Sequence, residues 1–85
     1  MSAPNALVAY RKYREYTIEQ EQLFESAKDA ARLSQERFRA GTAAYLEVLT
    51  NETNAFSYEL QLAQARGNDL TALVQLYQGL GGAWQ

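Results

Sequence analysis

The sequence predicts an all-α fold, a long antiparallel coiled-coil hairpin of two helices. Residues 5–40 contain no proline or glycine, small and apolar side chains recur there at alternating spacings of four and three, and the same spacing resumes after Gly41. A sustained seven-residue period is typical of helices that supercoil around each other. We therefore expect one domain over residues 1–85: a helix at 5–40, a turn at 41–43, a helix at 44–78 and a glycine-rich tail at 79–85.

The first helix is expected to begin at Pro4 and Asn5, because proline is not tolerated inside a helix and asparagine is a favoured N-cap. At about 1.5 Å per residue, each helix would be on the order of 50 Å long. The stripe expected to face the second helix consists of Ala6, Tyr10, Tyr13, Thr17, Gln20, Phe24, Ala27, Ala31, Ser34 and Phe38.

The turn is expected at Gly41, which is predicted to be the residue just past the first helix, where a positive φ favours glycine. Thr42 is expected to cap the second helix through its hydroxyl, and Glu47 to complement the helix dipole in its first turn. The short connection predicts two helices that lie side by side.

The second helix is expected to end near Tyr77 or Gln78, because Gly79, Gly81 and Gly82 follow. Its predicted contact stripe is Leu46, Leu49, Thr53, Phe56, Leu60, Ala63, Gly67, Leu70, Val74 and Tyr77.

Folding the chain back at Gly41 pairs positions whose residue numbers sum to about 84. Ala27 then faces Phe56, and Thr17 faces Gly67, so that large side chains lie opposite small ones. This register predicts that Gly67 is a point of close approach between the helices.

A second apolar stripe lies about a quarter turn from the first on the second helix: Tyr45, Val48, Ala55, Leu62, Leu73, Leu76 and Leu80. Two helices cannot cover both faces. A bundle formed by self-association and a hairpin from a larger ring of helices explain this stripe equally well.

Composition argues against catalysis and against nucleic-acid binding. The chain has no cysteine and no histidine, so disulfides, thiolate metal sites, a Glu-x-x-His di-metal motif and the commonest general base are excluded. Residues 5–40 hold seven Lys/Arg and six Asp/Glu, and residues 41–85 hold one and four. This balance fits two helices that attract each other and not a nucleic-acid surface. We expect no enzyme activity, no cofactor and no metal.

The ends of the chain carry no targeting or membrane signal that we recognise. Arg11, Lys12 and Arg14 follow the first residues too closely for a signal peptide. The charge-free run 70–85 is too short and too polar to span a bilayer, so a soluble piece is expected.

Two motifs resemble the TolC family of outer-membrane efflux proteins, and most closely the channel subunits that serve resistance-nodulation-division pumps. The first is Phe38, Arg39, Ala40 and Gly41, followed after three residues by Tyr-Leu-x-Val-Leu at 45–49. The second is the segment 61–84, which ends in Leu-Tyr-x-x-Leu-Gly-Gly-x-Trp. The resemblance covers nearly the whole chain, and the two motifs together are quite specific.

The resemblance implies one hairpin of the periplasmic α-barrel of a homotrimeric duct in a Gram-negative outer membrane. Its tip would dock a periplasmic adaptor (membrane fusion) protein, which serves an inner-membrane pump. The implied docking residues are Arg39, Ala40, Gly41, Thr42, Tyr45 and Leu46, and the implied pore-facing gate residues are Glu47, Thr50 and Glu52.

This sequence departs from the family pattern in three respects. The N-terminal anchor, the β-barrel strands and the first helical repeat are missing, so we expect an excised or truncated piece that cannot form a channel alone. Thr50 stands where the family often has an acidic residue, which leaves Glu47 or Glu52 to supply any charge-based gate. Ala44 replaces a polar residue that often precedes the tyrosine.

Two other functions compete with the duct component. One is an independent, self-associating antiparallel coiled-coil interaction module. The other is the hairpin of a pump adaptor, although no Val/Ile-rich strand flanks this one.

Overall fold

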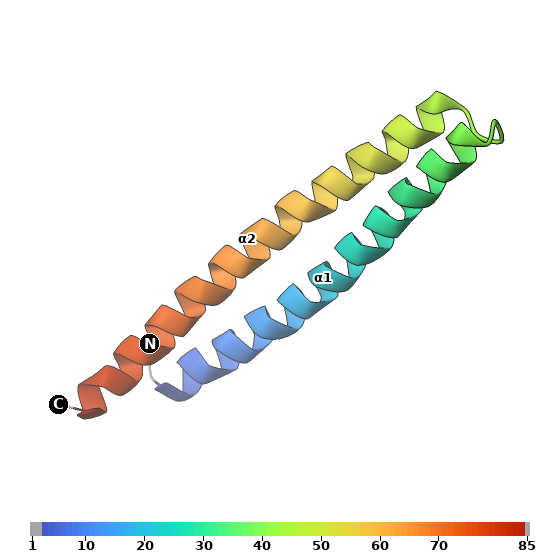
Figure 1. The fold of residues 1–85 in the computed structure, drawn as a ribbon. Helices are drawn as coiled ribbons and strands as arrows, with labels where there is room; N and C mark the ends of the chain where they lie inside the picture. The colour runs from blue at the N-terminus through green and yellow to red at the C-terminus, as the bar shows by residue number, and fades with distance from the viewer. Residues whose placement is uncertain (1–2, 85) are drawn as a thin grey trace.

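Two antiparallel helices form the whole described fold. The structure is a computed structural model that describes the backbone of residues 3–84 and the side chains of residues 5–81. Helix α1 spans Ala3–Arg39 and helix α2 spans Tyr45–Trp84. They lie side by side along their length in a rod of 65 × 15 × 14 Å (Figure 1). The all-α hairpin that the sequence predicts is confirmed.

The outer ends of both helices differ from the prediction. Helix α1 begins at Ala3, so Pro4 lies in its first turn and Asn5 is not the N-cap. Proline is tolerated there because the first amides of a helix have no intrahelical partner. Helix α2 continues past residue 78 to Trp84, so the expected glycine-rich tail is wrong for residues 79–84, and Gln85 lies outside the described residues. Glycine weakens a helix but does not end it where its φ stays negative.

The positive φ predicted for Gly41 is confirmed, and the capping role predicted for Thr42 is wrong. Gly41 has a φ of 79°, and it is the only glycine with a positive φ between residues 3 and 84. Its amide donates to the Phe38 carbonyl at 3.0 Å, and the Thr42 amide donates to the Arg37 carbonyl at 2.8 Å. These are the two hydrogen bonds of a Schellman motif, which satisfies the last carbonyls of a helix. The Thr42 hydroxyl also donates to the Arg37 carbonyl, at 3.1 Å, so Thr42 closes α1 and does not cap α2.

Helix α1 packs through the predicted stripe. Its buried residues are Ala6, Thr17, Gln20, Ala31 and Ser34. The cross-helix register is also close to the expected one: the residue numbers sum to 83 at Arg14 and Asp69 and to 84 at Arg37 and Glu47.

The face of α2 that packs is not the one that the sequence predicts. The buried residues of α2 are Val48, Leu62, Ala65, Asp69 and Ala72, two of them from the second stripe and none from the first. The predicted stripe points outward: Phe56 is 61% exposed, Leu70 64% and Tyr77 73%. Gly67 is exposed, and a Cβ added there would meet nothing within 4 Å, so the expected close approach opposite Thr17 is wrong.

Small side chains and polar contacts explain this choice of face. Thr17 is fully buried, and its hydroxyl donates to the carbonyl of Tyr13 at 2.8 Å and to that of Ala65, on α2, at 3.3 Å. Such a contact requires the two backbones to approach closely, which alanines permit and leucines prevent. One turn away, Arg14 reaches across to the nearly buried Asp69. The bulky stripe of α2 is therefore left for other contacts.

Within the described residues, neither helix combines the length and the apolar character that crossing a membrane demands.

Candidate functional site at the hairpin tip

The tip is the end of the rod where the last turn of α1 meets the first turn of α2 (Figure 1). The structure brings the six predicted docking residues together at this end, and all six are exposed: Arg39, Ala40, Gly41, Thr42, Tyr45 and Leu46. Tyr45 and Leu46 are 59% and 71% exposed. An exposed cation thus lies beside small residues and two bulky apolar ones.

Arg37 also lies at the tip, although it is not among the docking residues predicted from the sequence. Its guanidinium donates to the Glu47 carboxylate at 2.6 Å and to the Thr42 carbonyl at 3.3 Å. Its own carbonyl accepts the two bonds from Thr42 that close α1. The signal was present, because Arg37 and Glu47 are opposite charges whose residue numbers sum to 84, the predicted register.

An aromatic contact holds the other side of the turn. The rings of Phe38 and Tyr45 lie 5.3 Å apart between centroids, at an interplanar angle of 60°. This tilted arrangement is favourable for aromatic pairs. Beside it lies a shallow depression lined by Gln35, Phe38, Arg39, Tyr45, Val48 and Glu52.

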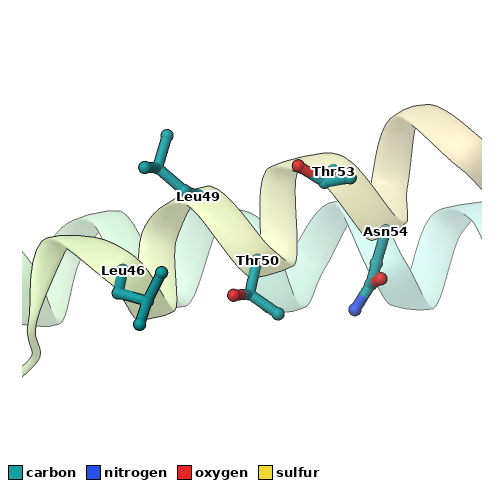
Figure 2. Close-up of a pocket in the computed structure, with 5 residues that line it drawn as sticks. All are labelled: Leu46, Leu49, Thr50, Thr53 and Asn54. Carbon is teal, nitrogen blue, oxygen red and sulfur yellow. The ribbon is translucent and has the colours of Figure 1, made fainter.

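A second hollow lies on the outward side of α2. It is lined by Leu46, Leu49, Thr50, Thr53 and Asn54. Figure 2 shows Leu46, Thr50 and Asn54 on one line along α2, while Leu49 and Thr53 project from its other edge. This hollow joins the tip to the exposed apolar stripe.

The three predicted gate residues do not share one environment. Glu47 is bound by Arg37, and the Glu52 carboxylate accepts a hydrogen bond from the Gln35 amide on α1. Thr50 lies exposed in the outward hollow. Both carboxylates are thus engaged across the hairpin, and the hydroxyl between them faces away.

The chemistry of the tip suits recognition of a protein surface. Among the described residues, no three Asp or Glu side chains gather in a way that would hold a metal ion. What the tip offers is a cation, exposed backbone around Gly41 and two apolar side chains on a turn fixed by hydrogen bonds.

Known proteins resemble this chain over almost its whole length. Residues 5–82 match the family model described as outer membrane efflux protein. The chain is 34% identical, over 80 residues and 94% of its length, to the probable efflux pump outer membrane protein TtgC of Pseudomonas putida. It is equally similar to the antibiotic efflux pump outer membrane protein ArpC of Pseudomonas putida.

A third relative carries a different name. Over 66 residues, or 78% of its length, the chain is 38% identical to the pyoverdine export outer membrane protein OpmQ of Pseudomonas aeruginosa. The chain spans only 16% of the length of TtgC and ArpC and 14% of OpmQ. No solved structure matches it significantly.

Proposed function

The chain belongs to the family of outer membrane efflux proteins, and on that premise we propose that it is one periplasmic hairpin of an efflux duct. In this proposal the hairpin is part of the wall of an α-barrel in a homotrimeric parent protein. Its tip docks the periplasmic adaptor of a tripartite export pump, and the adaptor links the duct to the inner-membrane pump. The hairpin itself carries no chemistry.

The outward stripe of α2 supports a place in a barrel wall. Five apolar residues of this stripe are each more than half exposed in the isolated hairpin: Leu46, Phe56, Leu70, Val74 and Tyr77. A helix that is apolar on two sides is expected to have neighbours on both. Neighbouring hairpins would cover this stripe, whereas the face toward α1 is already packed.

The observation that carries the docking proposal is a turn whose backbone is fixed and whose side chains are exposed. Hydrogen bonds from Gly41 and Thr42 hold the turn, yet Arg39, Ala40 and Thr42 are exposed to solvent. A rigid surface loses little conformational freedom when a partner binds. Its cation favours an acidic patch on the adaptor, because complementary charge gives specificity and faster association.

The pore-facing role of Glu47, Thr50 and Glu52 belongs to the same proposal. Arg37 balances the charge of Glu47, and Gln35 hydrogen-bonds Glu52. A gate built on these residues would therefore be tuned by contacts inside the hairpin and not by two free carboxylates.

The relatives suggest that this hairpin does not select the cargo. A protein named for antibiotic efflux and one named for pyoverdine export are 34% and 38% identical to this chain. Segments similar to this chain thus occur in proteins named for chemically different cargoes. We propose a common conduit and docking role, with cargo chosen elsewhere in the pump.

Cysteine cross-linking in the full-length efflux protein that carries this hairpin tests the docking. The chain has no cysteine, so Thr42→Cys introduces a single reactive site in the hairpin. Thr71→Cys is the matched control, because Thr71 is also an exposed threonine but lies far along α2. We expect a cross-link to the adaptor from position 42 and none from position 71.

A functional measurement complements the cross-link. Thr42→Glu removes the hydroxyl bond to Arg37 but keeps the two backbone bonds of the turn. It should raise drug susceptibility while trimer assembly stays normal, because a change at an exposed position usually alters stability by only about 0.5 kcal/mol. Unchanged efflux in Thr42→Glu together with no cross-link from position 42 would show that the tip connects the helices but does not dock the adaptor.

A self-associating coiled-coil module is the second candidate, and the same outward stripe of α2 favours it. Failure of the cross-link combined with stable self-assembly of the chain would support the module. The adaptor-hairpin alternative has no support in the family match.

A further inference from the structure

Arg37 joins three parts of the tip at once. Its guanidinium binds the Glu47 carboxylate in the first turn of α2 and the Thr42 carbonyl in the turn itself. Its backbone carbonyl accepts hydrogen bonds from the amide and the hydroxyl of Thr42. One residue therefore connects the end of α1, the connecting turn and the start of α2.

This ion pair differs from an ordinary surface pair. Arg32 and Glu36 also pair, at 2.9 Å, but both lie on α1, and their separation is set by the helix itself. Arg37 and Glu47 lie on different helices, so their 2.6 Å contact fixes how α2 departs from the turn. The contact constrains tertiary geometry and not helix formation.

The first turn of α2 has no side-chain cap at Ala44. Ala44 carries no side-chain acceptor, and its carbonyl accepts a bond from the Glu47 amide at 3.0 Å. Glu47 is the acidic residue of that turn. Its carboxylate suits the positive end of the helix dipole, and Arg37 fixes the position of that carboxylate.

The neighbouring residue restrains the turn from a second direction. Consecutive residues of a helix project about 100° apart. Phe38 contacts Tyr45 while Arg37 contacts Glu47, so two cross-turn contacts flank the connection on different sides. Together they limit both the separation and the rotation of the helix ends.

We propose that Arg37 is the positioning residue of the tip: its contacts with Glu47 and Thr42 hold the turn in the shape that a docking partner meets. This inference rests on the proposed docking function. Arg37 need not touch the adaptor, because it acts through the placement of Thr42 and of the first turn of α2.

Amide hydrogen exchange on the 85-residue chain tests the positioning without any partner. Arg37→Met keeps the apolar stem and the backbone bonds but removes the two guanidinium contacts. We expect the Thr42 amide to exchange about two- to fivefold faster, the effect that an exposed ion pair supports. Amides around buried Leu62, far from the tip, should not change.

Charge dependence separates this role from simple packing. In about 1 M salt the difference between Arg37→Met and the unchanged chain should shrink, because exposed charges are then screened. The swap Arg37→Glu with Glu47→Arg rebuilds the ion pair but not the bond to the Thr42 carbonyl, so it should recover only part of the slow exchange at Thr42. The control Arg32→Met removes a similar exposed pair within α1 and should leave Thr42 unaffected.

Cross-linking from Thr42→Cys in the full-length efflux protein tests the consequence for docking. Arg37→Met should lower the yield of the cross-link to the adaptor, and the charge swap should recover part of that yield. Faster exchange at Thr42 with an unchanged cross-link would overturn positioning for docking, and unchanged exchange would overturn the positioning itself.

Failure of the proposed docking gives a different pattern. No cross-link from position 42 even with Arg37 intact would reject the docking function, and with it this role for Arg37 in docking. Exchange at Thr42 would still decide whether Arg37 holds the turn.

Discussion

The Arg14 guanidinium lies 2.6 Å from the Asp69 carboxylate and joins α1 to α2 in the half of the rod away from the tip. The Asp69 side chain is only 11% exposed, whereas that of Arg14 is 44% exposed. The hydrogen bond to Asp69 and the negative charge of Asp69 both raise the pKa of Arg14 above its ordinary value. Arg14 therefore stays charged at all physiological pH values.

Removing Arg14 should destabilise the chain, because the nearly buried Asp69 carboxylate would lose its ion-pair partner. Arg14→Met should lower the urea midpoint of the chain, because the carboxylate would remain in the interface without its cation. The double variant Arg14→Met with Asp69→Leu should recover the midpoint, since apolar residues often replace an ion pair without loss. An unchanged midpoint for Arg14→Met would mean that water solvates the Asp69 carboxylate well enough without Arg14.

Thr17 should tolerate loss of its hydroxyl better than a gain in size. Thr17→Val removes the bonds to Tyr13 and Ala65 and should cost about 1 kcal/mol. Thr17→Leu should cost about 1 to 3 kcal/mol, because the fully buried position has no room for a larger side chain. Urea unfolding measures both, and leucine as mild as valine would contradict the close approach at this layer.

Gly41 and Gly67 should respond to alanine with opposite signs. Gly41→Ala should destabilise the chain by about 1 to 2 kcal/mol, because φ is 79° there. Gly67→Ala should stabilise it by about 0.5 to 1 kcal/mol, since the position is helical and open. Gly67→Leu should be tolerated too.

The measurement is urea unfolding at one fixed protein concentration, so that self-association does not mask the difference. A loss of stability in both alanine variants would show that Gly67 is packed after all.

The outward stripe of α2 should drive self-association of the isolated chain at micromolar concentration. Phe56 and Leu60 are 61% and 53% exposed and lie near the middle of this stripe. Phe56→Gln with Leu60→Gln should shift the chain toward monomer in sedimentation experiments, because apolar surface that association would bury is removed.

A matched control places the same change on the other helix. Leu7→Gln with Leu33→Gln alters two exposed leucines of α1 and should leave association nearly intact. A helical monomer of the unchanged chain at high concentration would disprove the prediction.

The sequence alone determined the two helices, the turn at Gly41 and the register. The helices follow from long segments without proline or glycine, and the turn and register follow from Gly41, which has the only positive φ between residues 3 and 84. The tip residues follow from the turn, because any residues beside it must lie at the end of the rod. The surroundings of the predicted gate residues could not be predicted from the sequence, since they depend on cross-helix contacts.

Only the tertiary structure decided which face of α2 packs against α1. Both stripes repeat with the spacing of a coiled coil, so periodicity cannot choose between them. The choice depends on how closely the backbones approach at Thr17 and Ala65 and on whether Arg14 can reach Asp69. These contacts join residues 48 and 55 positions apart. These contacts contribute free energy only after the helices meet. For this reason the sequence pattern led to the bulkier stripe as the hairpin interface, and that prediction is wrong.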